Sequence, residues 1–353
     1  MKKPKLLELD IVRGVAIAAV LLIHGTANAT VELSPNSRSQ TFYETVNQLS
    51  YFPVQLFILL SGLVLFYRYT ERWTFKTLAD FYRKRLQYIV VPYLIWSFGY
   101  YLFYKWLDPN IPVTVSIREF AGLLLWGEAG YHLYFMTLII QFYILFPLLQ
   151  SLAVWLKPFG KYLWLFGVAF QAVFSVYLYV TQSAVPHGDR LFVTYFALFC
   201  IGGSIGLNYE RFSAWLNRNI WWVTAAAASV GFIGVLFRAS AKFGMLSIPF
   251  TYQIHFHLYP VLIFASMAWI GKHLLNTRPR LAAALSSFGA AAFGIYFSHP
   301  MLQSLWYKYA YMPPGSLAYH LTLFSCVLLM FVLPWTIVHV LKRMKPSWVL
   351  FGK

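Results

Sequence analysis

Two basic residues stand in the first long apolar stretch of the sequence, LDIVRGVAIAAVLLIHG, which covers residues 9–25. Arg13 lies near its start and His24 near its end, with ten residues between them. A histidine takes up and releases a proton near neutral pH, and a guanidinium binds phosphate or carboxylate through two parallel hydrogen bonds. The chemistry open to this pair is therefore proton transfer beside a bound anion.

The spacing of the pair places both side chains on one face if the stretch is a helix. Eleven steps turn the chain by about 1,100°, which is three turns plus about 20°, and advance it by about 16–17 Å. Taken alone, Arg13 could snorkel to the membrane surface and His24 could be an ordinary satisfied polar residue. Together, and with Asp10 close by, they favour a site, because ionisable groups inside a membrane are costly and usually line a cavity.

The composition indicates which kind of element must hold these residues. Of the 353 residues, 59% are hydrophobic and only 11% are charged, whereas a soluble domain carries about a quarter charged residues. Long apolar runs recur along the chain, which predicts an all-α polytopic membrane protein with a single transmembrane domain over residues 1–353. We expect about ten spans, at residues 9–28, 50–67, 87–104, 132–151, 162–181, 191–208, 219–237, 252–271, 285–307 and 318–341.

The net charge is +17, and the basic residues are distributed unequally between the two sides of the predicted topology. With the N-terminus in the cytosol, 20 of the 28 Lys and Arg residues fall on the cytosolic side and seven fall outside. This bias predicts cytosolic N- and C-termini and contact with anionic lipid, and it argues against nucleic acid as a partner. The segment holding Arg238 and Lys242 is a local exception. Neither the two cysteines nor any histidine motif has the spacing of a metal site, so no metal is expected.

The first apolar stretch resembles the opening motif of the acyltransferase-3 family of integral membrane acyltransferases, in which an arginine, ten residues and a histidine follow one another. Four later segments resemble further motifs of that family in the expected order, so that the likeness covers most of the chain. They are FPVQLFILLSGLVLF, FYRKRLQYIVVPYLIW, GEAGYHLYFMTLIIQFYILFPLL and FGAAAFGIYFSHP. One departure is Leu63, where a Phe often follows Ser-Gly, and it leaves the chemistry untouched.

The resemblance implies an enzyme that transfers an acyl group, commonly acetyl, from cytosolic acyl-CoA to a hydroxyl of a cell-surface or lipid-linked carbohydrate. It implies no bound cofactor, with acyl-CoA (acetyl-CoA) as co-substrate. The expected location is the plasma membrane of a bacterial cell, and the expected partners are the bilayer, acyl-CoA, the carbohydrate acceptor and polysaccharide-synthesis proteins.

Within that reading, His24 and Arg13 are the catalytic candidates. His24 is expected to act as the general base on the acceptor hydroxyl, although it could itself carry the acyl group transiently. Ser61 is read as a helix-packing residue beside Gly62. The phosphates of the donor are expected to meet basic side chains near the cytosol, namely Arg13, Arg83, Lys84 and Arg85.

Five further residues could border a pocket for the acceptor on the outer side, although a place at the membrane interface, or loop solvation for Glu128, explains each of them at least as well. They are Glu128, Tyr131, His132, Tyr296 and His299. Two other functions also fit a helical membrane protein: a transporter or flippase, and a structural partner of a polysaccharide-export system without chemistry. Arg13 with His24, and the lack of sequence repeats, favour the enzyme.

Overall fold

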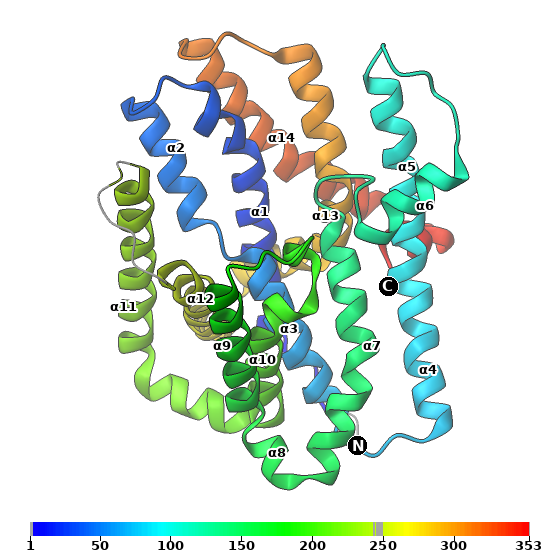
Figure 1. Ribbon diagram of the computed structural model, residues 1–353, viewed down its shortest axis with the longest axis vertical. Coiled ribbons are helices and arrows are strands. Elements are labelled where there is room, and N and C mark those ends of the chain that lie inside the picture. The colour runs from blue at the N-terminus through cyan, green and yellow to red at the C-terminus, as the bar shows by residue number, and fades with distance from the viewer. Residues whose placement is uncertain (1–2, 243, 245–249, 353) are drawn as a thin grey trace. The chain divides into compact units, whose positions relative to one another are not determined.

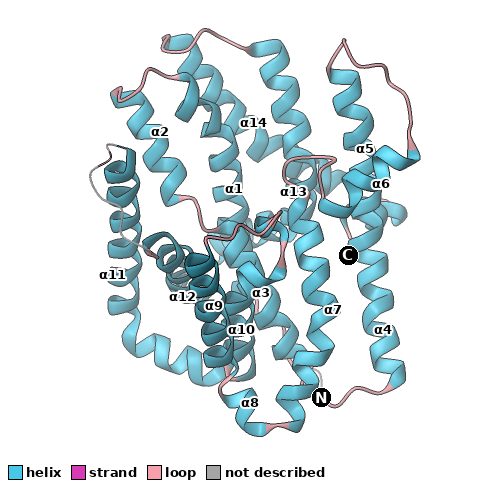
Figure 2. Ribbon diagram, in the orientation of Figure 1, coloured by secondary structure: helices cyan, strands magenta, loops and turns pink. Residues whose placement is uncertain are grey.

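The computed structural model describes residues 3–242, 244 and 250–352 of the chain. In that part the secondary structure is helical and contains no strand (Figure 2). Nine helical segments there are long and apolar enough to cross a membrane, which confirms the prediction of an all-α polytopic membrane protein. Their bounds are Glu8–Glu32, Arg38–Arg68, Phe75–Leu107, Tyr134–Trp155, Leu163–Thr181, Tyr209–Lys242, Thr251–Thr277, Pro279–Ala310 and Leu317–Leu341.

The span predicted at residues 191–208 is the one that differs from the others in length. The structure places a 3-10 turn, η3 (Phe192–Tyr195), and the helix α10 (Phe196–Leu207) there. Four residues of 3-10 helix and twelve of α-helix reach about 26 Å, somewhat less than the hydrocarbon thickness of about 30 Å. This apolar helix is therefore short for a full crossing, although hydropathy alone does not distinguish it from the others.

By its contacts the chain divides into two compact units. The first unit comprises Met1–Leu60 and Asn208–Trp335, and the second comprises Ser61–Leu207 and Thr336–Lys353. Residue 60 falls inside the helix α3 (Pro53–Arg68), and residue 335 falls inside α14 (Leu317–Leu341), so two helices contribute to both units.

The first unit is built around α1 (Glu8–Glu32). This helix packs against α13 (Pro279–Ala310), α2 (Arg38–Leu49) and α12 (Thr251–Thr277), and α12 in turn packs against α11 (Tyr209–Lys242) (Figure 1). Two glycines bring α1 and α13 together. A Cβ at Gly14 would lie 2.6 Å from the Leu285 carbonyl oxygen, and a Cβ at Gly289 would overlap the Asp10 carbonyl oxygen. Such small residues let two membrane helices approach backbone to backbone.

The second unit contains most of the remaining helices. They are α4 (Phe75–Arg85), α5 (Val91–Leu107), α6 (Ile117–Trp126), α7 (Tyr134–Trp155), α8 (Lys157–Lys161), α9 (Leu163–Thr181), α10 and α15 (Trp348–Phe351). Four short turns complete it: η1 (Leu86–Val90), η2 (Gly188–Arg190), η3 and η4 (Lys345–Ser347). Gly62 of α3 lies against the Phe199 carbonyl of α10, where a Cβ would clash. This contact agrees with the packing role expected of the Ser-Gly pair.

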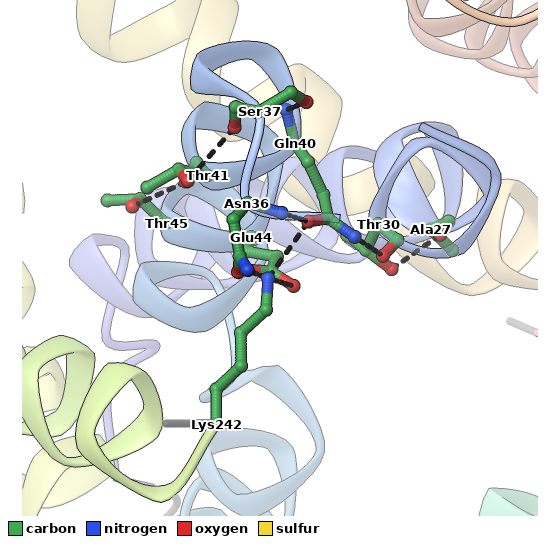
Figure 3. A network of polar contacts seen from close by, with 9 residues as sticks. All are labelled: Ala27, Thr30, Asn36, Ser37, Gln40, Thr41, Glu44, Thr45 and Lys242. Carbon is green, nitrogen blue, oxygen red and sulfur yellow. Dashed lines mark hydrogen bonds and ion pairs between the residues drawn. The ribbon is translucent and has the colours of Figure 1, made fainter. Parts of the chain in front are cut away.

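A polar network of the first unit involves Lys242, one of the two residues that depart from the predicted charge bias (Figure 3). The Lys242 ammonium lies 3.0 Å from both carboxylate oxygens of Glu44 and 2.9 Å from the Gln40 amide oxygen. The Gln40 amide nitrogen donates to the Thr30 carbonyl at 3.0 Å. The charge at the end of α11 is thus matched by a carboxylate on α2, and the network ties α1, α2 and α11 together.

Candidate functional site

The helix α1 carries both Arg13 and His24. It is one continuous α-helix from Glu8 to Glu32. Arg13 and His24 are therefore related by eleven regular helical steps, which leave them about 20° apart around the axis. The prediction that a single helix positions the pair on one face agrees with this geometry.

Arg13 is held by the carboxylate one turn before it. Its Nη1 donates to Asp10 Oδ1 at 2.6 Å, while Lys5 Nζ lies 2.5 Å from Asp10 Oδ2. The Asp10 side chain is only 10% exposed, whereas that of Arg13 is 31% exposed. The buried carboxylate is itself held by two cations, so it keeps the guanidinium in a fixed position from which it can bind an anion.

His24 meets a second histidine from a helix that lies far along the chain. The centroid of its ring lies 5.3 Å from that of His299 on α13, with 33° between the ring planes. His299 is fully buried, and its Nδ1 lies 2.9 Å from the Ile295 carbonyl oxygen of its own helix. A carbonyl oxygen can only accept, so this Nδ1 carries the hydrogen, and Nε2 is the basic nitrogen of the neutral ring.

Polar residues continue from this histidine pair along both helices at four-residue spacing. On α13 the positions are His299, Gln303 and Tyr307, and on α1 the positions after His24 are Asn28 and Glu32. The Gln303 amide nitrogen donates to the His24 carbonyl at 2.6 Å. Glu32 accepts a hydrogen bond of 2.8 Å from the Tyr319 hydroxyl. Residues four apart share one face of a helix, so each apolar helix carries a polar stripe that starts at its histidine.

The stripe and Gln303 were not predicted from the sequence, although the sequence contains a pattern that reveals both. Hydropathy treats α13 as a uniformly apolar segment, but a search for polar residues repeated at four-residue spacing finds His299, Gln303 and Tyr307. Tyr296, which was grouped with His299 as a candidate for acceptor binding, lies on α13 three residues before it, with its ring against Phe297.

The basic triad expected to bind the donor forms the last turn of α4 in the second unit. Arg83 Nη2 donates to Asp80 Oδ1 at 3.0 Å, Lys84 is exposed, and the Arg85 guanidinium carbon lies 4.6 Å from the centroid of the Phe81 ring. Directly after the triad, η1 is a π-helical turn, and Pro92 follows at the start of α5. A proline lacks the N–H that would bond four residues back, and a widened turn accommodates it; such turns are frequent at functional sites.

The other three candidates, Glu128, Tyr131 and His132, lie between α6 and α7 in the second unit. Glu128 Oε1 is ion-paired with Arg190 Nη1 at 2.5 Å, and Arg190 also donates to the Trp126 carbonyl at 3.1 Å. His132 is buried, and its ring lies 4.9 Å from that of Tyr100 and 5.4 Å from that of Tyr131. The rings of Tyr131 and His132 thus lie in contact. The Glu128 carboxylate instead holds the segment that contains η2, through its ion pair with Arg190.

Several membrane-crossing helices and a pair of histidines among apolar residues define a multi-pass membrane protein with a polar site inside its helices. The chain matches the acyltransferase domain family (Acyl_transf_3) over residues 6–339. It therefore belongs to this family and is a membrane acyltransferase. No curated protein and no solved structure matches the chain.

Proposed function

We propose that the protein is a membrane O-acyltransferase, most simply an O-acetyltransferase. It would move the acyl group from cytosolic acyl-CoA to a hydroxyl of a cell-surface or lipid-linked carbohydrate. Membership of the family supports acyl transfer in general. The observation that carries the finer proposal is the placement of His24 beside His299 on helices that are otherwise mainly apolar.

In this proposal His24 is the general base. The imidazole takes the proton of the acceptor hydroxyl while the oxygen attacks the thioester carbonyl. The tetrahedral intermediate then collapses, the carbon–sulfur bond breaks, and the proton passes from the imidazolium to the departing CoA thiolate. The products are the ester and free CoA, and the base returns to its neutral form. Positioned proton transfer of this kind contributes about 10²–10⁴-fold to a rate.

His299 takes a different role here from the one the sequence suggested. Its ring lies against His24 and its Nδ1 is tied to the Ile295 carbonyl, so its place in the proposal is beside the base. The acceptor-side candidates that remain in the proposal are Tyr131, His132 and Tyr296. Glu128 is not among them, because its carboxylate is paired with Arg190.

The donor would be bound by basic side chains. In the first unit Arg13 forms an ion pair with Asp10. In the second unit the last turn of α4 contains Arg83, Lys84 and Arg85. Guanidinium groups suit the phosphates of CoA because they bind them through paired hydrogen bonds. The bacterial plasma membrane as the location, and polysaccharide-synthesis proteins as partners, also belong to this proposal.

Inverted membrane vesicles test the donor and the acceptor together. Vesicles from cells that make the protein would receive acetyl-CoA labelled with ¹³C on the acetyl group, and the carbohydrate fraction would be analysed by mass spectrometry. We expect labelled ester in the carbohydrate, and none in vesicles from cells that lack the gene. Equal labelling in both preparations, or label confined to other fractions, would contradict the proposal.

A further inference from the structure

The backbone around His24 receives an unusual set of hydrogen bonds. Three successive carbonyl groups of α1 accept a bond from a side chain: Leu22 from Thr26 Oγ1 at 2.6 Å, Ile23 from Asn47 Nδ2 at 2.9 Å, and His24 from Gln303 Nε2 at 2.6 Å. A carbonyl oxygen has two lone pairs, so it can accept these bonds in addition to the regular bond within the helix. Two of the three donors come from other helices.

These two donors approach the same turn from different partners of α1. Asn47 lies on α2 and Gln303 on α13, and both helices pack against α1. Gln303 is buried, with 8% of its surface exposed. A buried amide is costly unless it is hydrogen-bonded, so the bond to the His24 carbonyl helps to hold the Gln303 side chain in this position.

A third helix closes the turn from another direction. Gly25 follows His24 directly, and a Cβ there would overlap the Val327 side chain of α14 and approach the Met330 Cε to 3.0 Å. The absence of a side chain at residue 25 lets α14 pack against the backbone. The turn that carries His24 is thus held by α2, α13 and α14, each through a different contact.

We propose that Asn47 and Gln303 are positioning residues, which fix the rotation and depth of the His24 turn and so aim its imidazole beside His299. Neither side chain bonds the imidazole through these contacts, since both bond the backbone. The catalytic consequence of this inference rests on the proposed function, whereas its geometric part does not.

The expected consequence follows from how sensitive proton transfer is to geometry. A displacement of about 1 Å in a catalytic group can cost about 100-fold in rate. If either amide is lost, the base is displaced while the donor and the acceptor still bind, so kcat should fall by about 10–100-fold with KM nearly unchanged.

Two near-isosteric substitutions remove the bonds one at a time: Gln303→Met and Asn47→Leu. A matched control is Gln150→Met in the second unit. Gln150 is 1% exposed and donates in the same way to the Glu71 carbonyl at 2.9 Å, but it lies on α7, away from His24 in the chain. Because the two test residues lie on different helices, one of them still tests the inference if the other variant fails to accumulate.

The first readout needs no substrate. Diethylpyrocarbonate modifies neutral imidazole, and peptide mass spectrometry gives the modification rate of each histidine in the purified full-length protein. We expect the rate at His24 to rise severalfold in Gln303→Met and Asn47→Leu and to stay unchanged in Gln150→Met, with the exposed His273 as an internal reference. An unchanged rate at His24 in both test variants would overturn the inference, whatever reaction the protein performs.

The second readout is acyl transfer. In protein that transfers acyl groups, we expect the two test variants to lose kcat at unchanged KM, and Gln150→Met to keep the wild-type kcat. Variants that raise the reactivity of His24 but keep full kcat would overturn the catalytic part of the inference. Wild-type protein that transfers no acyl group would instead contradict the proposed function, and the reactivity of His24 would still decide the geometric part.

Discussion

At the scale of single residues, the candidate site depends on what surrounds each ionisable group. Arg13 and His24 lie on the same helix in different surroundings. Arg13 is paired with a buried carboxylate and is partly exposed, whereas His24 lies against a second imidazole. The first environment suits the binding of an anion, and the second suits proton transfer, which is the division of roles that the residue types predict.

Replacing Arg13 with Lys tests its role in binding the donor. A lysine keeps the charge but lacks the planar pair of N–H groups, so the phosphate contact weakens. We expect KM for acyl-CoA to rise about tenfold, with a smaller change in kcat. Steady-state kinetics of acyl transfer would measure this, with Arg118→Lys on the exposed face of α6 as the control. An unchanged KM would remove Arg13 from the donor site.

At the scale of secondary-structure elements, the pairing of α1 with α13 creates the histidine pair. That pairing depends on Gly14 and Gly289, which let the two backbones touch. A helix one methyl group farther away would change the separation of His24 and His299, because both rings project into the same contact between the two helices.

Gly289→Ala should therefore destabilise the protein. The added Cβ would overlap the Asp10 carbonyl oxygen, which is backbone and cannot rotate away. We expect a loss of about 1–3 kcal/mol, visible as a lower Tm in detergent. Gly122→Ala on α6 is the matched control, since a Cβ there has no neighbouring atom within 4 Å. Equal Tm values for the two variants would contradict the close approach of α1 and α13.

The segment that leads into α6 should respond to acid. Glu119 accepts hydrogen bonds of 2.8 Å from Lys105 Nζ and from the Tyr101 hydroxyl, and these bonds hold the pKa of its carboxyl below the usual value of 4.5. A lowered pKa in the folded state means that the contribution to stability is present above the unfolded pKa and is lost as the pH falls through the folded pKa. We expect hydrogen exchange in residues 114–119 to accelerate in that acidic range, and Glu119→Gln to remove the pH dependence. The effect should be small, because the Glu119 side chain is 45% exposed and solvent screens its charge.

At the scale of the whole molecule, the sequence predicts where the helices lie along the chain better than it predicts which helices contact one another. Apolar runs are long because they must cross a bilayer, so they predict nearly every helix, including α1 and α13 as the carriers of His24 and His299. The meeting of these two histidines could not be predicted, because their residues are 275 positions apart and many helix pairings satisfy the same hydropathy. The ion pair of Glu128 with Arg190 could not be predicted for the same reason, because it depends on how η2 and α6 meet in space.

The predicted orientation of the chain can be tested directly. With the N-terminus in the cytosol, residue 76 lies inside and residue 38 lies outside, and both residues are exposed. In intact cells, a membrane-impermeant maleimide should label Arg38→Cys but not Lys76→Cys, while the native Cys200 and Cys326 are buried. The opposite pattern of labelling would invert the topology and place the basic triad of α4 on the side away from cytosolic acyl-CoA.

The central claim is that His24 is the base of the acyl transfer. The most direct measurement compares the ester-linked acyl groups on surface carbohydrate, by mass spectrometry, in cells that make the wild-type protein or His24→Ala. The account predicts that acylation disappears in His24→Ala, while the amount of protein in the membrane and its Tm stay close to the wild-type values. Normal acylation in cells whose only copy is His24→Ala would contradict the claim.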